Sequence, residues 1–366
     1  MNKDNLLYKI EENKSKILLV FSILFLSIIV IIGVVLFRKS NLYQSFNSAS
    51  SSKYILASNI IGVNHDGTIN LYNSKNGKLV DELKLNGDYL IDSSDDFTSI
   101  YMLNTANGEV FKISSKNDKI KKEKEDIVVE NPSIVDSFDY DNGSIAVLYN
   151  NKKSFFIKHT SSKTAETFSP NVTDDIDLFR IVKDNLIFTS GEFIYSKGLS
   201  TDIANFKEST TSDGGTVKIH IGEKSNYIHE FEDKVFIHNN FGEDRGISIL
   251  LDINPENLYI QNLIEFNNIT NSLITNSNDS KLYINEISDT AESKVRQIIK
   301  YNEIEKFNER LGFKYTSETI LDNENAYGML GYVYYKDSKG VNIYNLKSQE
   351  KDLTLEISND FFAPLY

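Results

Sequence analysis

The sequence from Ile60 to Leu85, IIGVNHDGTINLYNSKNGKLVDELKL, predicts three short strands joined by two turns. The first strand is apolar and β-branched, and the His65-Asp66-Gly67 turn follows it, because Gly accepts the positive φ that tight turns require. The second strand alternates, with Ile69 and Leu71 on one face, and a turn ending in Asn76-Gly77 leads into the third. One such meander cannot bury its apolar faces alone, so we expect the unit to recur.

Similar groups of strands do recur along the chain. Gly108 follows Gly67 by 41 residues (108 − 67) and closes another Asn-Gly turn. Val341–Asn345 repeats the pattern of Ile69–Asn73 position for position, which is the strongest internal match. Further groups of strands are expected over residues 144–168, 178–206, 216–253, 258–287 and 326–357. The spacing indicates about seven units, with eight as the alternative.

The residues of this unit resemble a known repeat. An Asp-Gly turn, a strand ending in an aromatic and a small polar residue, and then a Gly turn resemble one blade of a WD-like or quinoprotein-like β-propeller. Tyr72-Asn73 stand where Trp-Asp stand in WD blades. The chain has no Trp, so both the WD dipeptide and the tryptophan-docking motif of quinoproteins are missing. The resemblance implies an all-β propeller over residues 54–366 and does not support a quinone cofactor or a named partner.

Charge and cysteine content narrow the classes of function. The 366 residues carry 39 Lys+Arg and 52 Asp+Glu, a net charge of −13. Residues 1–39 hold six basic and three acidic side chains, a charge of +3, so the rest carries −16, the difference between −13 and +3. An acidic main domain repels phosphate backbones, which disfavours nucleic-acid binding. Because the chain has no Cys, disulfides, thiolate metal sites and thiol nucleophiles are excluded.

A long uncharged stretch near the N-terminus predicts a membrane anchor. Ile17 to Phe37 is 21 residues long and, as a helix, would extend roughly 31 Å, about one hydrocarbon core. Arg38-Lys39 follow directly, which favours a retained anchor over a cleaved signal peptide. Residues 1–16, with four Lys, are expected to be a cytoplasmic tail, and residues 38–53 a flexible Ser/Asn-rich tether. The domain over residues 54–366 is then expected outside the cytoplasmic membrane.

One segment departs from the strand pattern. Residues 289–312 carry apolar side chains at helical spacing, among them Val295, Ile298 and Ile299, with charges on the other face and Gly312 as a stop. We expect one inserted amphipathic helix packed on the side or rim of the propeller. A helix that binds a partner in a groove is the alternative.

The two ends of the repeat region are expected to meet. A propeller removes its free sheet edges by bringing its first and last blades together. The match between Ile69–Asn73 and Val341–Asn345 indicates equivalent strands of adjoining blades. The chain ends are then tied together either by a blade built from both termini or by direct packing of the first blade on the last. Asp352 to Ile357 alternates apolar and polar residues, as a C-terminal strand packed on one face would.

The histidines are interpreted as ordinary strand residues. If Glu232-Asp233 is a two-residue turn, residues 229 and 236 face each other, as do 227 and 238. His229 and His238 then share a face at a diagonal separation of about 7–8 Å. That separation is wide for joint ligation of zinc without a further donor.

The carboxylate clusters are interpreted as solvated turns, with calcium in one of them as the alternative. The loop from Asp139 has Asn150 at its twelfth position, where a calcium loop requires Glu. No P-loop, G-x-S-x-G or strand-to-helix G-x-G-x-x-G motif occurs. We therefore assign no catalytic, cofactor-binding or metal-binding residue. The clusters are Asp92/Asp95/Asp96, Asp139/Asp141 and Asp174/Asp175/Asp177.

These observations favour a single-pass, membrane-anchored, extracytoplasmic β-propeller that acts as a protein-binding or scaffolding module of the bacterial cell envelope. The expected partners are the membrane, through Ile17 to Phe37, and another envelope protein, and no cofactor is expected. The alternative is a propeller enzyme, of the metal-dependent hydrolase or lactonase type, with its site in the central channel.

Overall fold

The computed structural model describes residues 55–366, apart from residues 95, 142, 163–164, 200–215, 223, 226, 232–233, 242–246, 267–269, 273, 276–280, 288–292, 300–311, 315–325 and 346–349. The chain divides into two units, Met1–Lys53 and Tyr54–Tyr366, and all described residues belong to the second. The expected tail, membrane span and tether therefore lie outside the described residues. In the part that is described, no helix is long and apolar enough to cross a membrane.

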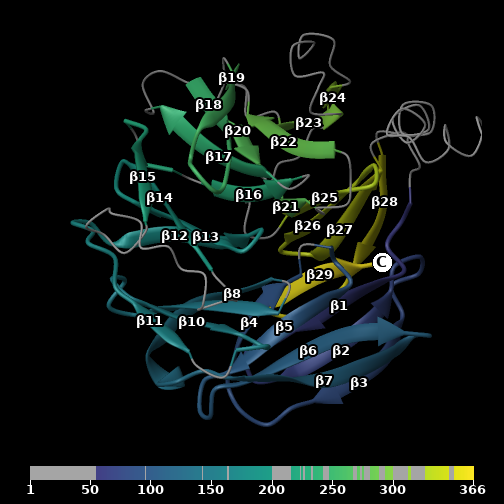
Figure 1. The fold of residues 1–366 in the computed structure, drawn as a ribbon. Coiled ribbons are helices and arrows are strands. Elements are labelled where there is room, and N and C mark those ends of the chain that lie inside the picture. The colour runs from purple at the N-terminus through teal and green to yellow at the C-terminus, as the bar shows by residue number, and fades with distance from the viewer. Residues whose placement is uncertain are drawn as a thin grey trace, which may run out of the picture. The chain divides into compact units, whose positions relative to one another are not determined.

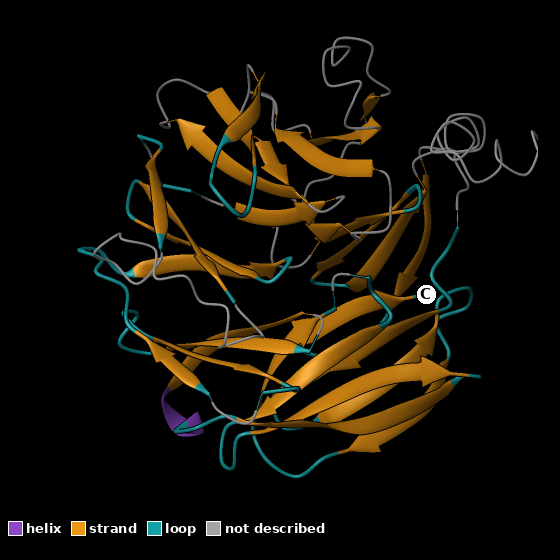
Figure 2. Ribbon diagram, viewed as in Figure 1, coloured by secondary structure: helices purple, strands orange, loops and turns teal. Residues whose placement is uncertain are grey.

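The described residues form strands almost throughout, with one short 3-10 helix, η1 (Pro132–Ile134) (Figures 1 and 2). The first sheet has the order β29-β1-β2-β3, with strands β1 (Asn59–Val63), β2 (Thr68–Asn73), β3 (Leu79–Lys84) and β29 (Phe361–Leu365). The second comprises β4 (Tyr89–Ser93), β5 (Ser99–Asn104), β6 (Glu109–Lys116) and β7 (Lys119–Val128). The third comprises β8 (Val135–Asp141), β9 (Ser144–Tyr149), β10 (Phe155–His159) and β11 (Glu166–Phe168).

Four more sheets follow along the chain. The fourth comprises β12 (Ile176–Val182), β13 (Asn185–Ser190), β14 (Phe193–Gly198) and β15 (Val217–His220). The fifth comprises β16 (Tyr227–Phe231), β17 (Lys234–Phe241), β18 (Ile247–Ile253) and β19 (Ile260–Phe266). The sixth comprises β20 (Thr270–Ser272), β22 (Lys281–Ile287), β23 (Ser293–Ile299) and β24 (Gly312–Lys314). The seventh comprises β21 (Ile274–Thr275), β25 (Ala326–Met329), β26 (Tyr332–Asp337), β27 (Gly340–Asn345) and β28 (Glu350–Leu355).

The first sheet is built from both ends of the described chain, which is one of the two forms of closure that the sequence predicts. β29 pairs antiparallel with β1, from Asn59 opposite Leu365 to Val63 opposite Phe361. The amide of Ser58 also donates to the carbonyl of Leu365 at 2.9 Å. The predicted strand Asp352 to Ile357 forms as β28, one strand earlier than the strand that pairs with β1. Closure therefore uses a segment, Phe361–Leu365, that sequence reasoning had not singled out.

The predicted match between β2 and β27 is confirmed in detail. Each is the third strand of its sheet when strands are ordered from β29 or β25 outward. Both pair with an outer neighbour through the same irregularity, a register shift between Leu71 and Tyr72 in β2 and between Ile343 and Tyr344 in β27. A one-residue shift at the same repeat position is a β-bulge retained between two copies of the unit.

A glycine with the same role stands at, or directly before, the start of β2, β6 and β27. A Cβ on Gly67 would lie 2.6 Å from the carbonyl oxygen of Leu85, and one on Gly340 would lie 2.0 Å from that of Leu355. Gly108, 41 residues after Gly67, would place its Cβ 2.1 Å from the carbonyl oxygen of Val129. All three have positive φ, so the backbone of the outer strand can approach only because this position lacks a side chain.

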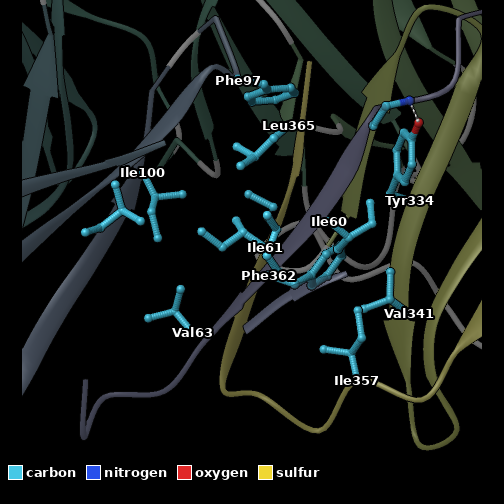
Figure 3. Close-up of a cluster of buried hydrophobic side chains, with 14 of the residues drawn as sticks. Ile60, Ile61, Val63, Phe97, Ile100, Tyr334, Val341, Ile357, Phe362 and Leu365 are labelled. Atoms are coloured by element: carbon cyan, nitrogen blue, oxygen red, sulfur yellow. Dashed lines mark hydrogen bonds between the residues drawn. The ribbon is translucent and has the colours of Figure 1, made fainter. Parts of the chain in front are cut away.

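The largest buried cluster joins the first sheet to its neighbours (Figure 3). All five residues of β1 are buried, because β1 lies between β29 and β2 with apolar layers on both faces. Phe362 and Leu365 of β29 lie in this cluster beside Val341 of β27 and Ile100 of β5. The amide of Ala57 donates to the Tyr334 hydroxyl at 2.9 Å, which ties the segment before β1 to β26.

The first strands of successive sheets lie beside one another. β4 contacts β8, β8 contacts β12, and β12 contacts β16. The fourth strands, by contrast, are largely exposed, and β7 is the clearest example, with polar side chains over most of its length. We call the first strands inner and the fourth strands outer.

The structure assigns two strands, β15 and β19, to other sheets than the sequence predicts. β15 was expected to begin the fifth group (residues 216–253), but it pairs with β14 and completes the fourth sheet. β19 was expected to begin the sixth group (residues 258–287), but it completes the fifth. The sequence analysis ends the fourth group at residue 206 and begins the fifth at residue 216, whereas β14 and β15, on either side of this connection, belong to one sheet. Loop length adds little free energy to strand pairing, so it is a weak guide to sheet boundaries.

The amphipathic helix expected over residues 289–312 is wrong where the structure describes that segment. Ser293–Ile299 forms β23, which pairs with β22 over seven residues and with β24 on its other edge. Val295, Ile298 and Ile299 fit helical spacing, but all three are β-branched and suit a strand equally well. Pairing between two neighbouring strands decides the conformation, because tertiary context overrides weak local propensity.

Candidate functional site

Polar side chains gather on the inner strands of three sheets and on β25 of a fourth. Asp92 lies on β4, Asp139 on β8, Arg180 on β12 and Tyr327 on β25. We call these four residues the inner-strand cluster. Each comes from a different sheet, so only the folded ring brings them together.

The two carboxylates of this cluster bind the backbone of the next sheet. Asp92 Oδ2 accepts a hydrogen bond from the Tyr140 amide of β8 at 3.2 Å. Asp139 Oδ2 accepts one from the Ile181 amide of β12 at 2.5 Å, and that bond is buried. Successive inner strands thus repeat one contact, in which a carboxylate binds the amide of its neighbour. A carboxylate that accepts an amide hydrogen bond is stabilised in its ionised form.

Arg180 and Tyr327 add a cation and a hydroxyl. Arg180 Nε lies 4.0 Å from Asp139 Oδ1, and both side chains are largely buried. Burial raises the pKa of Tyr327, the negative charge of Asp92 raises it further, and Arg180 opposes the rise. The phenol therefore stays protonated and offers a hydrogen-bond donor. Its hydroxyl is buried and has no hydrogen-bond partner among the residues that the structure describes.

The ring of Tyr327 is held on two sides by aromatic neighbours. Its centroid lies 5.4 Å from that of Phe97 and 5.2 Å from that of Phe362, both in edge-on geometry. Edge-on aromatic pairs of this kind are favourable beyond simple area burial. The orientation of the hydroxyl is therefore set by packing with residues of the β4–β5 connection and of β29.

The histidines do not converge in the described part of the chain. The predicted hairpin register is confirmed, since His229 pairs with Phe236 and Tyr227 with His238. His65 Nδ1 lies 2.9 Å from the Tyr89 carbonyl oxygen, and His220 Nε2 lies 2.9 Å from Glu192 Oε2. His159 Nδ1 lies 2.6 Å from Ser161 Oγ.

Burial changes the charge state of the His238 imidazole. It is 0% exposed, and burial lowers its pKa to about 3. At neutral pH it is therefore an uncharged imidazole in the interior of the fifth sheet.

The remaining carboxylates of the three predicted clusters serve turns and ion pairs where they are described. Asp96 is partly buried, which opposes ionisation, but hydrogen bonds from Ser94 and Thr98 outweigh burial and lower its pKa. Asp175 pairs with Lys153 at 3.5 Å and Asp177 with Lys224 at 2.6 Å. Across the described ranges, no group of three or more His, Asp or Glu side chains is arranged to hold a metal ion.

Sequence reasoning identified Asp92 and Asp139 as members of turn clusters and missed Arg180 and Tyr327. The sequence does contain a signal for Arg180, because this charged residue interrupts an otherwise apolar strand. The apolar residues around it are Leu178, Phe179, Ile181 and Val182. A charged residue within an inner strand has to find a partner. Tyr327 carries no such signal, since tyrosine is common in strands and its position opposite other sheets depends on the ring.

Comparison with known proteins supports the fold and goes no further. No protein-family model matches the chain, and no curated protein matches it in sequence. Two solved structures of AztD from Citrobacter koseri are similar, each at 12% identity, with TM-scores of 0.50 and 0.51. They cover 85% and 83% of this chain, and 100% and 96% of their own. A functionally unknown protein from Desulfotomaculum acetoxidans has a TM-score of 0.52 at 12% identity, with 85% of this chain and 99% of that chain covered.

The fold is a β-propeller. Four-stranded antiparallel sheets, inner strands in mutual contact and the solved neighbours all agree on this. At such low identity the likeness concerns the fold alone. Each four-stranded sheet corresponds to one blade.

Proposed function

We propose that the chain is a single-pass, membrane-anchored, extracytoplasmic propeller of seven blades that acts as a protein-binding module of the bacterial cell envelope. The observation that carries the binding role is the use of the inner-strand carboxylates. Asp92 and Asp139 bind backbone amides of adjacent blades, so their chemistry maintains the ring. A rigid ring that presents outer strands and loops is suited to partner recognition.

The anchor and the orientation rest on sequence. Ile17 to Phe37 has the length and composition of a membrane span. The lysine-rich tail before it is retained in the cytoplasm, which leaves residues 54–366 outside. The strong acidity of that region suits a soluble surface held in water near a membrane.

The absence of cysteine allows a clean topology experiment. A single cysteine is introduced as Lys78→Cys, at an exposed turn, or as Ser15→Cys, in the N-terminal tail. An impermeant maleimide added to intact cells stripped of their wall should label the first variant and not the second. Labelling at residue 15 alone would place the propeller in the cytoplasm and refute the proposed orientation.

The binding role is tested by crosslinking on intact membranes. The full chain, tagged at its N-terminus, is treated with an impermeant bifunctional reagent and purified under denaturing conditions. A matched control ends at residue 53 and keeps the tail, span and tether. We expect a protein crosslinked to the full chain and not to the control. The same set of proteins on both would contradict a binding role for the propeller.

A second candidate is a central-channel enzyme, favoured by the buried Tyr327 hydroxyl, which has no hydrogen-bond partner among the described residues and whose pKa responds to the charges of Asp92 and Arg180. Such a role requires a bound small molecule or metal ion. Purified full chain in detergent is denatured, and the released material is analysed by mass spectrometry and elemental analysis. A stoichiometric ligand that Tyr327→Phe no longer retains would favour this candidate over the binding module.

A further inference from the structure

An open groove lies between the outer parts of the fourth and fifth blades. It has a volume of about 610 Å³, within the range of ligand-binding clefts. We call it the β15–β19 groove, and it is lined by Lys218, Ile219, Asn257, Leu258, Tyr259 and Ile260. Two outer strands therefore contribute, β15 from one blade and the start of β19 from the next (Figure 1).

The surface around this groove concentrates exposed apolar side chains. Seven large apolar residues of the described chain are exposed, and three of them lie here: Tyr259 (71%), Leu263 (54%) and Val217 (39%). Leu258 beneath them is buried in the core shared by the two blades. Exposed apolar side chains grouped over a firm base are typical of a contact surface.

The groove follows the edge of a strand. Lys218 and Ile219 are consecutive on β15, so their side chains point to opposite faces of the sheet, yet both line the groove. β15 is the outermost strand of its blade, and in the described residues its second edge pairs with no strand. An unpaired edge beside an apolar groove is the geometry in which an extended peptide adds to a sheet.

The charge of the groove selects the kind of peptide. Lys218 supplies the charged group of its lining, and the other lining side chains that the structure describes are apolar or, in Asn257 and Tyr259, neutral and polar. Asp177 of β12 pairs with Lys224 and Glu192 pairs with His220 of β15, whereas the exposed Glu256 lies next to Asn257 in the sequence. A positive group in an otherwise acidic domain attracts a negative partner side chain.

We propose that the β15–β19 groove is the docking site for an extended, acidic segment of a partner protein. The segment pairs with the free edge of β15, places apolar side chains against Ile219 and Tyr259, and places a carboxylate beside Lys218. This inference rests on the protein-binding role proposed above and names the surface that performs it.

The test uses the full chain in detergent and two synthetic peptides. One alternates Val and Glu over eight residues, and its counterpart has Lys in place of Glu; both carry a fluorophore for anisotropy. We expect the acidic peptide to bind and the basic one not to bind. Lys218→Glu should weaken the acidic peptide at least tenfold, and Tyr259→Ala at least fivefold, because most of the Tyr259 side chain is exposed and available for contact.

The matched controls are Lys78→Glu and Leu79→Ala. They change the same kinds of residue, an exposed lysine beside an exposed apolar side chain, at the start of β3 in another blade. Both should leave peptide binding unchanged. Equal binding of the two peptides, or equal loss in the control variants, would refute the docking site.

Two further measurements separate this inference from its alternatives. If a partner crosslinks on membranes and Lys218→Glu and Tyr259→Ala leave the yield unchanged, the groove is refuted while the binding role stands. If no partner crosslinks at all, the binding role fails. A dimer in analytical ultracentrifugation that Tyr259→Ala dissociates would instead identify the occupant as a second copy and overturn the acidic-partner proposal.

Discussion

Asp139 should contribute directly to stability through its contact with the neighbouring blade. Its carboxylate accepts the buried amide of Ile181 and lies beside Arg180. Asp139→Ala would remove the acceptor of the buried Ile181 amide and the carboxylate that lies 4.0 Å from Arg180 Nε. We expect a loss of about 2–4 kcal/mol in the free energy of unfolding, measured by urea denaturation of the full chain in detergent.

Asp136 provides the control on the same strand. It is partly exposed and lies 3.9 Å from Lys152, a surface contact of little energetic value. Asp136→Ala should leave the denaturation midpoint close to that of the unchanged chain. If both alanine variants lose the same stability, the contact between blades is not what Asp139 contributes.

His238 should make the stability of the propeller depend on pH. Its pKa is lowered to about 3 by burial, whereas an unfolded histidine titrates near 6.5. Below a pH of about 6.5 the imidazole of residue 238 is therefore protonated in the unfolded state and uncharged in the folded state. The free energy of unfolding consequently decreases as the pH falls. We expect a loss on the order of 2 kcal/mol between pH 6.5 and 5, measured by unfolding at each pH.

The pH effect of His238 can be separated from its packing. His238→Gln removes the titration, so its stability should change less between pH 6.5 and 5 than that of the parent, whatever its absolute value. A His238→Gln chain with an unchanged slope would show that other groups govern the acid response.

At the scale of elements, β29 is the strand on which closure depends. It covers the free edge of β1 and buries Phe362, Ala363 and Leu365 in the largest core cluster. Deleting residues 361–366 should lower the melting temperature steeply or cause aggregation, because an unpaired edge and an apolar face become exposed. Deleting residues 1–53 should not alter melting, since the core described here lies wholly beyond them.

A single substitution at the end of β28 should approach that effect. Leu355 is 1% exposed and packs in the same cluster as β29. Leu355→Asp would bury a carboxylate without a partner and should cost more than about 3 kcal/mol, measured by urea denaturation. The matched variant Leu79→Asp is at a half-exposed position and should cost far less.

Local chemistry was enough to predict many elements. The Gly67 and Gly77 turns form with the positive φ that the sequence requires, and the His229–Phe236 register follows from a two-residue turn. The repeat match correctly placed β2 and β27. The helix expected at Ser293–Ile299 failed because β-branched residues at helical spacing satisfy both periods, and only the neighbouring strand decides between them.

The candidate site was much less predictable than the strands. Asp92 and Asp139 were visible as carboxylates, but their amide partners belong to other blades and are not encoded near them in the sequence. The β15–β19 groove depends on which blade each outer strand joins, and that assignment was the one shifted by one strand. Properties that depend on contacts between blades therefore required the structure.

For the molecule as a whole, closure predicts that the propeller tolerates new termini. Tyr366 and Ile55 lie close together, since the Tyr366 hydroxyl donates to the Ile55 carbonyl at 2.9 Å. A circular permutant would join these ends by a short Gly-Ser linker and open the chain at Asn117-Asp118, the exposed turn between β6 and β7. We expect cooperative melting within a few degrees of residues 54–366 with their original termini.

The permutant has a control that should fail. Opening the chain instead between Ile61 and Gly62, inside buried β1, interrupts pairing on both sides of that strand. Differential scanning calorimetry should detect a cooperative transition for the first permutant and none for the second. Equal behaviour of the two would mean that the pairing of β1 with β29 does not organise the domain.

The pairing of β29 with β1 also determines when the first blade can be completed during synthesis of the chain. The His65 amide bonds to Asp360, a partner 295 residues later, so the first blade cannot be completed until the last residues have been synthesised. At about 5–20 residues per second, that interval is roughly 15–60 s. During that interval the edge of β1 that later pairs with β29 has no partner strand. A chain that ends before Phe361 therefore differs from the finished protein by an unpaired edge of β1, to which another chain can add a strand.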